Sequence, residues 1–511
     1  MATFRSHARR AYALLSISIL CLITACGGPA ASESSGGPDT SPTLDGTPGE
    51  STPLSARLPS NRNPVVSTIS PTALATSGGA SLHIYGANIL GGTSLAVSIG
   101  GTPCTSVVRV SSTHLTCVTP AKVAGVYDVV VINPDGTTSG TSGAGMYRAV
   151  GSPPVASKKS LRGTNLVGME GGYGFNQASG PIPDTDYAVH SNQIVDYLAG
   201  KHVNVIRLLF SWERMQSTLS GPIPAATSGN YKAYFDDYKR VVDYATNVKG
   251  MTVIMEPWQA SSSGGVGGPS WRGNVVGAGV VTNAHFADFW SKMAVLFASN
   301  SRVAIGLVNE PSNMSTMTWF SAAQAAITAV RATGFGGDIQ VPGNGWTGAG
   351  SWNEAWYDTA SPQRSNAYGW LNARGLGLPL LDPLARLVVG VHSYADSDAA
   401  GSSTATVSST ISRTRVKVAV DWARANGIEV FVGEIGMSST AANASANWTD
   451  FVAYLDANAD TLTGYAWWGC GKPGWWDDLA ASGGGHFSIT PTANYTADTV
   501  NMNMIKGSFA P

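Results

Sequence analysis

The sequence predicts two folded domains: a small all-β sandwich, followed by a larger (β/α)8 TIM barrel of the α/β class. Residues 63–150 consist of short alternating runs separated by Gly, Pro, Asn and Asp turns, which is typical of an all-β sandwich. Over residues 158–511, apolar strands and amphipathic helices alternate eight times. That rhythm predicts a parallel sheet closed into a barrel and covered by helices.

Composition argues against a nucleic-acid partner. The 511 residues carry a net charge of −1 at pH 7, only 12% of them are charged, and no basic patch stands out. The 15 tryptophans offer flat apolar faces with one polar N–H each, which suits sugar binding as well as ordinary core packing. A monomer is expected.

Residues 1–25 have the layout of an export signal. Arg5, Arg9 and Arg10 precede a short apolar run, and small residues lead up to Cys26. The run is too short to span a bilayer comfortably. Residues 26–62 are rich in Ser, Pro, Gly and Thr and predict a flexible tether. We therefore expect an exported protein, either attached to the cell surface or released.

The segment "ITAC", which ends at Cys26, resembles a bacterial lipobox. In a lipobox the cysteine becomes the lipidated first residue of the mature protein. The resemblance implies that the chain meets a membrane only through a lipid anchor. The alternative is an ordinary signal peptide in which Cys26 is incidental.

The first domain resembles the IPT/TIG family of immunoglobulin-like sandwiches. The segments that carry the resemblance are, in order, "ISP", "IYGANI", "VSIGGTPC", "LTCVTP" and "YDVVVINPDG". Cys104 and Cys117 fall on neighbouring predicted strands, and in an exported protein we expect them to form a disulfide. The domain shows no catalytic pattern, so a spacer, a carbohydrate contact and a protein contact are all open roles.

Functional residues gather where the predicted barrel strands end. The predicted strands are "SLRGTNLVG", "VNVIRLLF", "MTVIMEP", "VAIGLVNE", "DIQVPGN", "LVVGVHSY", "IEVFVGEIG" and "TGYAWWGCG". In a barrel of this class the C-terminal strand ends form the active-site face. The residues at these ends are Arg207, Glu256, Asn309, Glu310, Asn344, His392, Tyr394, Glu434 and Trp468. A carboxylate that closes an apolar run is not core material, since burying it unpaired is strongly unfavourable.

These strand ends resemble glycoside hydrolase family 5, the cellulase family. The matching segments are "LRGTNLVG", "VIRLLFSWERMQ", "GLVNEP", "VHSYADSD", "FVGEIG" and "YAWWG". The stretch that ends in "VAIGLVNEPSNM", followed by "IQVPGNGWTGAGSW", is most similar to the endo-β-1,4-glucanases of the family. The resemblance spans the whole barrel and implies an enzyme that hydrolyses β-glucan polysaccharides by double displacement, without a cofactor or a metal.

The resemblance also implies roles for single residues. Glu310 is expected to be the acid/base and Glu434 the nucleophile, since a retaining glycosidase uses two carboxylates about 5 Å apart. Asn309 is expected to contact the sugar 2-hydroxyl. The remaining expected substrate-site residues are Arg207 and Tyr394, which keep Glu434 ionised, His392, which orients the acid/base, and Trp468, a platform under the sugar. The alternative for Arg207 is a barrel-end ion pair only.

One strand end departs from the family. The family reads Asp-Pro-His-Asn where this chain has Glu256, Pro257, Trp258 and Gln259. Glu256 is therefore expected to be structural, whereas Trp258 replaces a histidine that contacts sugar hydroxyls. The departure keeps other substrates open: mannan, and branched or mixed-linkage β-glucan. A cell-surface protein that binds glycans without cleaving them is the alternative from another functional class.

The lipobox predicts a thioether-linked diacylglycerol on Cys26. Expression of the full chain in bacteria fed radioactive palmitate is expected to label the protein, and Cys26→Ser is expected to abolish the label because it removes the thiol that accepts the lipid. An unlabelled mature protein that begins elsewhere would mean ordinary secretion.

Overall fold

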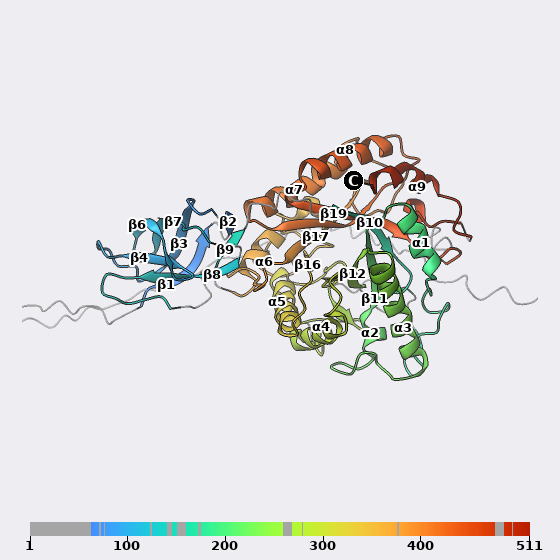
Figure 1. Cartoon of the computed structure of the whole chain (residues 1–511), viewed down its shortest axis with the longest axis horizontal. Helices are drawn as coiled ribbons and strands as arrows, with labels where there is room; N and C mark the ends of the chain where they lie inside the picture. Colours follow the sequence, from blue (N-terminus) through green and yellow to red (C-terminus); the bar gives the residue numbers. More distant parts are fainter. Residues whose placement is uncertain are drawn as a thin grey trace, which may run out of the picture. The chain divides into compact units, whose positions relative to one another are not determined.

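The computed structural model describes most of the two predicted domains (Figure 1). The described residues are 63–70, 73–75, 77–122, 125–140, 146–150, 160–171, 175–258, 268–277, 279–375, 378–475, 485–492 and 494–510. The expected signal peptide, tether and lipidation site at Cys26 lie outside these residues. Within them, no helix combines the length and the apolar character that a membrane crossing requires.

The N-terminal domain is built from two sheets, as the sequence predicts. One sheet has the order β1 (Val65–Ser70), β3 (Ser81–Ala87), β7 (His114–Val118), β6 (Thr105–Ser111). The other has the order β2 (Ala73–Ala75), β9 (Met146–Val150), β8 (Gly125–Ile132), β4 (Ala96–Ile99), β5 (Thr102–Pro103). Alternate residues of both sheets, such as Leu82 and Ile84 on β3 and Val129 and Val131 on β8, form one buried cluster.

The cysteine pair of this domain differs from the sequence expectation. Cys104 and Cys117 are buried thiols, and no bridge joins them in the structure. They are nevertheless neighbours, because Thr105, next to Cys104, is paired with Val118, next to Cys117. The hydrogen bond with Cys104, together with burial, raises the pKa of the Cys117 thiol. The difference is therefore one of oxidation state, not of position.

The C-terminal domain is a closed barrel of parallel strands, which confirms the predicted fold class. Its strands, in order around the barrel, are β10 (Leu161–Leu166), β11 (Val205–Ser211), β12 (Thr252–Trp258), β15 (Val303–Gly306), β16 (Ile339–Pro342), β17 (Leu387–Tyr394), β18 (Glu429–Gly436) and β19 (Leu462–Cys470). All eight coincide with predicted strand segments. In the hairpin that follows β12, β13 (Ser270–Trp271) pairs with β14 (Asn274–Val275).

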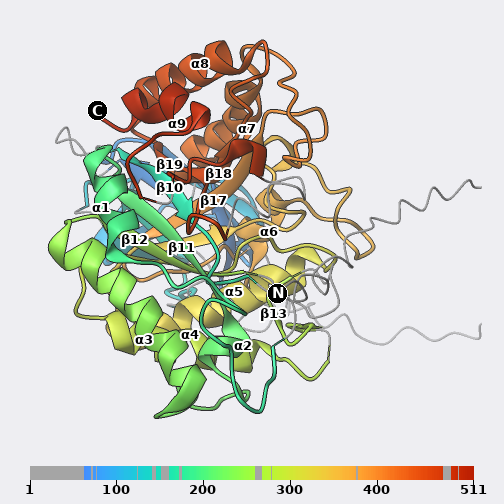
Figure 2. The same ribbon diagram turned by 90° about the vertical axis from the view of Figure 1, so that its right-hand side faces the viewer.

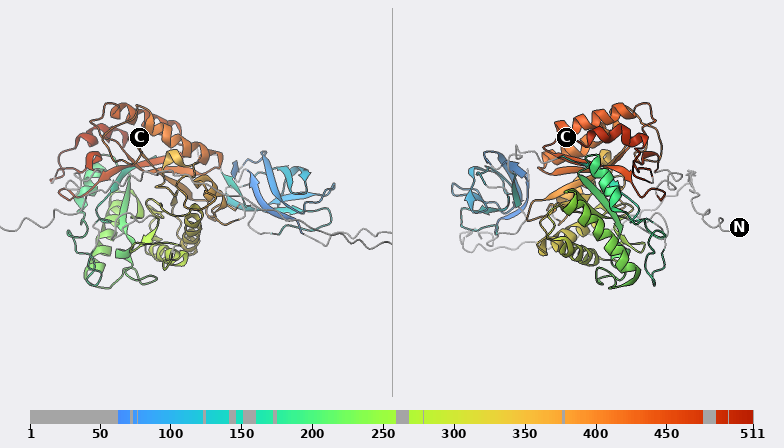
Figure 3. Two further views of the ribbon diagram at one scale, coloured as in Figure 1. Left: turned by 180° about the vertical axis from the view of Figure 1, so that it is seen from behind. Right: turned by 45° about the vertical axis from the view of Figure 1, so that its right-hand side comes forward.

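Helices surround the barrel (Figures 2 and 3). They are α1 (Asn192–Gly200), α2 (Trp212–Met215), α3 (Gly229–Asp243) continued by a π-helical turn (Tyr244–Val248), α4 (Asn283–Phe297), α5 (Thr316–Ala332), α6 (Asn366–Asn372), α7 (Ile411–Ala425), α8 (Ala444–Ala457) and α9 (Val500–Ile505). α4 shows why they form: a capping box between Thr282 and His285 opens it, and Phe286, Phe289 and Trp290 form its buried stripe.

The inside of the barrel is divided into an apolar layer and a polar layer. Val205, Ile254, Ala304, Val388, Phe431 and Ala466 form the apolar layer. Side chains two positions apart on a strand point to the same face. The next inward residues are therefore Arg207 after Val205, Glu256 after Ile254, and Trp468 after Ala466. The strand ends thus present charged and aromatic groups to the active-site face.

A register irregularity places Glu434. The pairing of β17 with β18 shifts between Val391 and His392, so that His392 lies opposite Glu434. Such an irregularity re-aims the side chains beyond it. The residue before Glu434 is Gly433, and a Cβ at this position would lie only 3.1 Å from His392 Nε2. The shift therefore turns Glu434 toward the interior beside the imidazole.

The proximity of Cys104 and Cys117 predicts that they oxidise to a disulfide in an exported protein. The intact mass of the non-reduced protein is expected to be lower by two hydrogens, and reduction is expected to destabilise the sandwich by about 3 kcal/mol, the value for a loop of this length. The unfolding free energy of Cys104→Ser/Cys117→Ser provides the reduced reference. A mass that does not change on reduction would contradict the bridge.

Candidate active site

Arg207 is the centre of the polar layer. It is fully buried on β11, and each of its N–H donors has an acceptor. Nε and Nη2 donate to the two oxygens of Glu256 at 2.8 and 2.9 Å. Nη1 donates to Asn165 Oδ1 at 2.6 Å and to Glu434 Oε1 at 2.9 Å, and Nη2 also donates to Asn309 Oδ1 at 2.5 Å. A buried cation is tolerated only when it is paired and hydrogen-bonded in this way.

Glu256 is the bidentate partner of Arg207, as its expected structural role requires. Its carboxylate is buried at the end of β12, and it occupies space that only glycine leaves free on the next strand. A Cβ on Gly306 of β15 would lie 2.1 Å from Glu256 Oε2. The pair of Glu256 and Gly306 therefore fixes the orientation of the guanidinium that Glu434 and Asn309 share.

Glu434 is held on both oxygens. Oε1 accepts from Arg207 Nη1 at 2.9 Å, and Oε2 accepts from the Tyr394 hydroxyl at 2.5 Å. Burial and the charge of Glu434 raise the pKa of Tyr394, so the phenol stays protonated and remains a donor. The side chain of Glu434 is only 2% exposed. These two contacts are the ones that the sequence predicted for Arg207 and Tyr394.

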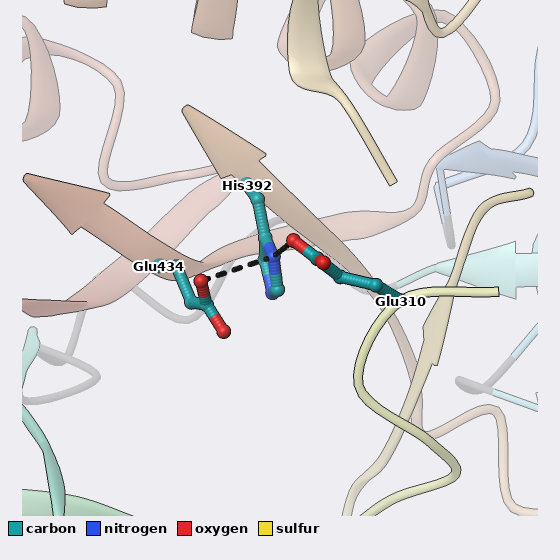
Figure 4. A group of neighbouring side chains, drawn as sticks. All are labelled: Glu310, His392 and Glu434. Atoms are coloured by element: carbon teal, nitrogen blue, oxygen red, sulfur yellow. Dashed lines mark hydrogen bonds and ion pairs between the residues drawn. The ribbon is translucent and has the colours of Figure 1, made fainter. Parts of the chain in front are cut away.

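Glu310 lies beyond the end of its strand. β15 ends at Gly306, and the following segment keeps its place through bonds such as Asn309 N to Pro257 O at 3.0 Å. Glu310 Oε1 shares a hydrogen bond with His392 Nδ1 at 2.7 Å, and the same nitrogen lies 3.5 Å from Glu434 Oε2 (Figure 4). The imidazole thus stands between the two carboxylates, which is the orienting position expected for His392.

The two carboxylates lie close together but differ in solvent exposure. One atom each of Glu310, His392 and Glu434 lie within 4.8 Å of one another, a closeness that is compatible with the short carboxyl separation of a retaining pair. The side chain of Glu310 is 21% exposed, against 2% for Glu434. Glu310 is therefore the more accessible carboxyl of the two.

The surroundings place the proton on Glu310. Burial raises the pKa of Glu310 to about 7, and burial also raises the pKa of Glu434. Glu434, however, accepts bonds from the Arg207 cation and from Tyr394, whereas Glu310 shares a hydrogen bond with His392, whose pKa burial lowers to about 4. Since two adjacent carboxylates do not both ionise readily, the direct ion pair with Arg207 favours an ionised Glu434 and a proton on Glu310.

Asn309 offers one unused donor. Its Oδ1 is occupied by Arg207, while its buried Nδ2 has no partner among the described residues. A buried polar nitrogen without a partner is costly unless a ligand satisfies it. The orphan donor is therefore consistent with the expected contact to a substrate hydroxyl.

The two tryptophans of the site lie against each other. The rings of Trp258 on β12 and Trp468 on β19 stack with their centroids 5.4 Å apart and their planes 24° apart. Trp468 is almost buried and Trp258 is half-buried. Trp258 therefore belongs to the same aromatic wall as the expected sugar platform, in place of the family's histidine.

Sequence reasoning missed two residues near the site. Asn165, at the end of β10, accepts from Arg207 and could have been suspected as a polar residue at a strand end. Trp346, in the segment after β16, is 45% exposed, and its backbone N–H donates to the carbonyl of Pro311, the residue after Glu310. Asn344, which the sequence also places at a strand end, is buried and donates to Met314 O.

The two carboxylates and the imidazole between them also have the residue types and the spacing that could hold a metal ion, and no other such cluster occurs among the described residues. The cluster comprises Glu310, His392 and Glu434. The buried Arg207 guanidinium lies 2.9 Å from Glu434, and this fixed positive charge opposes a second cation. The same closeness is what acid/base and nucleophile chemistry requires, so the cluster is explained without an ion.

A closely spaced carboxylate pair at the C-terminal end of a (β/α)8 barrel, one of them ion-paired with a buried arginine, is the arrangement that glycoside hydrolysis uses. Residues 162–471 match the family model described as cellulase (glycosyl hydrolase family 5), and residues 64–147 match the IPT/TIG domain. The chain belongs to glycosyl hydrolase family 5 and carries an IPT/TIG domain.

Known relatives are endoglucanases. Endo-beta-1,4-glucanase A of Emericella nidulans is 31% identical over 65% of this chain and 87% of its own length, and Endoglucanase 1 of Robillarda sp. is 30% identical over 65% and 80%. Among solved structures, an endo-beta-1,4-glucanase of Xanthomonas axonopodis pv. citri has a TM-score of 0.58 at 28% identity, covering 68% of this chain and 98% of that one. The Pseudomonas stutzeri endoglucanase Cel5A in complex with cellobiose has a TM-score of 0.53 at 25% identity, covering 69% and 92%.

Substitutions of Glu256, Glu310 and Glu434 are expected to differ in their effects on activity and stability. Glu434→Ala removes the expected nucleophile and is therefore expected to abolish turnover. Glu310→Gln is expected to lower kcat by about 10²- to 10⁴-fold, the usual contribution of a general acid. Glu256→Gln keeps one acceptor for Arg207, so it is expected to destabilise the fold by about 1–3 kcal/mol and to retain far more activity than either. Steady-state kinetics and thermal unfolding check this order. Equal losses in all three variants would contradict the division.

The pKa of Glu310 predicts the alkaline limb of the pH profile. Because this carboxyl must be protonated to assist the leaving group and its pKa is about 7, kcat/KM is expected to fall as the pH rises through about 7. Glu310→Gln has no titrating carboxyl at this position, so its residual activity is expected to lack that limb. An alkaline limb unchanged in this variant would assign it to another group.

Proposed function

We propose that this protein is an exported retaining endo-β-1,4-glucanase that hydrolyses O-glycosidic bonds within β-glucan chains. The observation that carries the proposal is the pair of Glu310 and Glu434, with atoms within 4.8 Å of each other and of His392. The endo-β-1,4-glucanase relatives, and a solved structure of XacCel5A in complex with cellopentaose at 28% identity and a TM-score of 0.57, support the substrate class.

In the proposed reaction, each of these residues has a role in one of the two displacement steps. The Glu434 carboxylate attacks the anomeric carbon, the bond to the leaving oxygen breaks, and the Glu310 proton passes to that oxygen. In the second half, Glu310 takes a proton from water, the water oxygen attacks the same carbon, and Glu434 leaves. Arg207 and Tyr394 hold Glu434 for attack, and Asn309 Nδ2 donates to the 2-hydroxyl. Because inversion happens twice, a β-linked substrate releases a β-anomer.

Trp346 extends the proposed site on the leaving-group side. Its backbone is tied to Pro311, the residue after the acid/base, and its ring is exposed. A flat indole face beside the general acid suits the sugar unit that departs. Trp468 and Trp258, which stack on each other, are assigned to the unit that becomes attached to Glu434.

Trp258 favours a second candidate within the same chemistry. An indole can stack or donate through one N–H but cannot accept a hydrogen bond, so a hydroxyl that the family's histidine would read is left without that partner. A mannan, or a branched or mixed-linkage β-glucan, is then the alternative substrate. A protein that only binds glycans has no chemical need for both glutamates. Export, with a lipid anchor at Cys26, belongs to the proposal on the strength of the N-terminal sequence alone.

The test is a panel of soluble glycans with the purified protein: carboxymethyl cellulose, mixed-linkage β-glucan, xyloglucan and β-mannan, scored by released reducing ends. β-1,4-Glucan is expected to be cleaved, Glu434→Ala is the blank, and the initial product is expected to be the β-anomer by NMR. Activity is expected to survive a chelator. This arm is informative, since a relative at 26% identity, from Phanerodontia chrysosporium, is called a manganese dependent endoglucanase. Cleavage of mannan alone, or an α-anomer, would contradict the proposal.

Trp258→His is expected to shift the preference toward linear chains. Restoring the acceptor recovers a hydrogen bond worth about 1–3 kcal/mol in a dry site, so the ratio of kcat/KM on linear to branched β-glucan is expected to rise by about ten- to a hundredfold. Trp258→Phe, which keeps a stacking ring and adds no acceptor, is the matched control. A ratio that does not move would mean that Trp258 does not read the sugar.

A further inference from the structure

A buried ring that has no part in the proposed chemistry packs against Tyr394, the residue that hydrogen-bonds Glu434. The rings of Tyr394 and Phe487 stack with their centroids 5.7 Å apart and their planes 21° apart. Phe487 ends a 3₁₀-helical turn (Gly485–Phe487) that follows β19, and its side chain is only 1% exposed. The stack therefore belongs to the interior, and it contacts the phenol that donates to Glu434 Oε2.

Two glycines make room for these rings. A Cβ on Gly436, two residues after Glu434 on β18, would lie 2.9 Å from Phe487 Cδ2 and 3.2 Å from Tyr394 Cε1. A Cβ on Gly401, whose φ is +70°, would lie 2.8 Å from Tyr394 Cδ1. The phenol is thus enclosed by the backbone of two segments and by the Phe487 ring, so its orientation depends on how closely these neighbours pack.

The backbone that carries Phe487 is tied to β19. Trp467 Nε1 donates to Phe487 O at 2.8 Å, and Ile489 N donates to Gly469 O at 3.0 Å. Trp467 and Gly469 both belong to β19, which pairs with β18 in the barrel. The Phe487 ring is therefore fixed relative to the strand that carries the proposed nucleophile.

Asn501, the second residue of α9, joins the same segment to the chain that follows β18. Its Nδ2 donates to His486 O at 2.9 Å and to Ser488 O at 3.1 Å, the carbonyls on either side of Phe487. Its Oδ1 accepts from Ser439 N at 3.0 Å. The side chain is only 5% exposed, so these three bonds form in a low dielectric and are costly to leave unmade. One amide thus holds the turn in place.

The orientation of the phenol decides how well it serves Glu434. A hydrogen bond weakens steeply as its angle departs from linearity, and a tilt of the ring displaces the hydroxyl at its far end. Arg207 donates to Glu434 Oε1 and Tyr394 donates to Oε2, so a tilted phenol leaves Oε2 without this donor. Loss of a donor to a buried carboxylate favours its protonated form, which does not attack.

We propose that Phe487 is a positioning residue for hydrolysis: stacked on Tyr394 and held by Asn501, it keeps the phenol directed at Glu434. The side chain of Phe487 has no polar atom, so its effect on the carboxylate passes through the ring on which it stacks. The inference rests on the proposed function for the role of Glu434 as nucleophile. The segment after β19 and α9 thereby contribute to the site, although they supply none of the proposed catalytic residues.

A double-mutant cycle tests this coupling. Tyr394→Phe is expected to lower kcat/KM by about 10- to 100-fold, as loss of one hydrogen bond to a charged group predicts. Phe487→Leu, which keeps apolar volume without the flat ring, is expected to lower it by about five- to tenfold, a part of that loss. In the Tyr394→Phe background, Phe487→Leu is expected to change kcat/KM by less than about twofold, because the hydroxyl that it positions is absent. Phe487→Tyr keeps a ring and is expected to restore most of the activity. Losses that multiply in the double variant overturn the proposal.

Phe509→Leu is the matched control. Phe509 is also buried, also follows α9, and also stacks on a tyrosine, Tyr465, with centroids 6.1 Å apart and planes 27° apart. The Tyr465 hydroxyl shares a hydrogen bond with Ser508 Oγ rather than with a carboxylate of the site. The same substitution there is expected to lower thermal stability and to leave kcat/KM unchanged. An equal loss of kcat/KM would mean that Phe487→Leu acts by loosening the fold, which overturns the positioning role.

A second measurement does not depend on the substrate. In protein labelled at the glutamate side-chain carboxyls, weaker donation from Tyr394 is expected to raise the pKa of Glu434. Its carbon resonance then titrates at higher pH in Phe487→Leu and in Tyr394→Phe than in the wild type. Asn501→Ala, which loosens the turn without changing either ring, is expected to shift the resonance in the same direction and serves if Phe487→Leu does not fold. The other groups that face this carboxyl are unchanged in these variants: Arg207, His392 and Glu310.

The same change is expected in the pH profile, whichever glycan is cleaved. Since Glu434 attacks in its ionised form, a higher pKa moves the acid limb of kcat/KM to higher pH. A Glu434 resonance that titrates at the same pH in the wild type and in both ring variants overturns the positioning role, whatever the enzyme cleaves. Cleavage of mannan alone, with the shift present, would overturn the glucanase proposal and leave the positioning role standing.

Discussion

The active site depends on one buried cation whose hydrogen-bonding capacity is completely used. Arg207 joins β10 through Asn165, β12 through Glu256, β18 through Glu434, and the segment after β15 through Asn309. A guanidinium has a fixed planar geometry, so each acceptor constrains the others. The strand ends are therefore held in one arrangement, and a change in any partner leaves a buried donor or acceptor unpaired.

That arrangement gives two chemically identical side chains different tasks. Glu434 sits in the field of Arg207 and accepts from Tyr394, while Glu310 is more exposed and shares its proton with the neutral His392. The inequality comes from the position of the positive charge, because burial alone raises the pKa of both carboxyls. His392 lies between the two carboxyls, so a proton gained or lost by one of them changes the pKa of the other.

Much of this could be predicted from the sequence because barrel strands are local patterns. Apolar runs of four to nine residues become β10 to β19, and inward positions follow from the two-residue repeat, so Arg207, Glu256 and Trp468 are found from spacing. Family motifs then identify Glu310 and Glu434. Contacts across the barrel were less visible. The acceptor role of Asn165 toward Arg207 and the stacking of Trp258 on Trp468 join residues 42 and 210 positions apart, and the place of Trp346 depends on a loop path that no periodicity encodes.

The central claim is that Arg207 keeps Glu434 ionised and leaves the proton on Glu310. The most direct measurement is carbon NMR of protein labelled at the glutamate side-chain carboxyls, titrated from acid to alkaline pH without substrate. The account predicts a resonance that titrates near pH 7 in the wild type and is absent in Glu310→Gln. A resonance that still titrates near pH 7 in Glu310→Gln, and is lost in Glu434→Gln, would place the proton on the other carboxyl and contradict it.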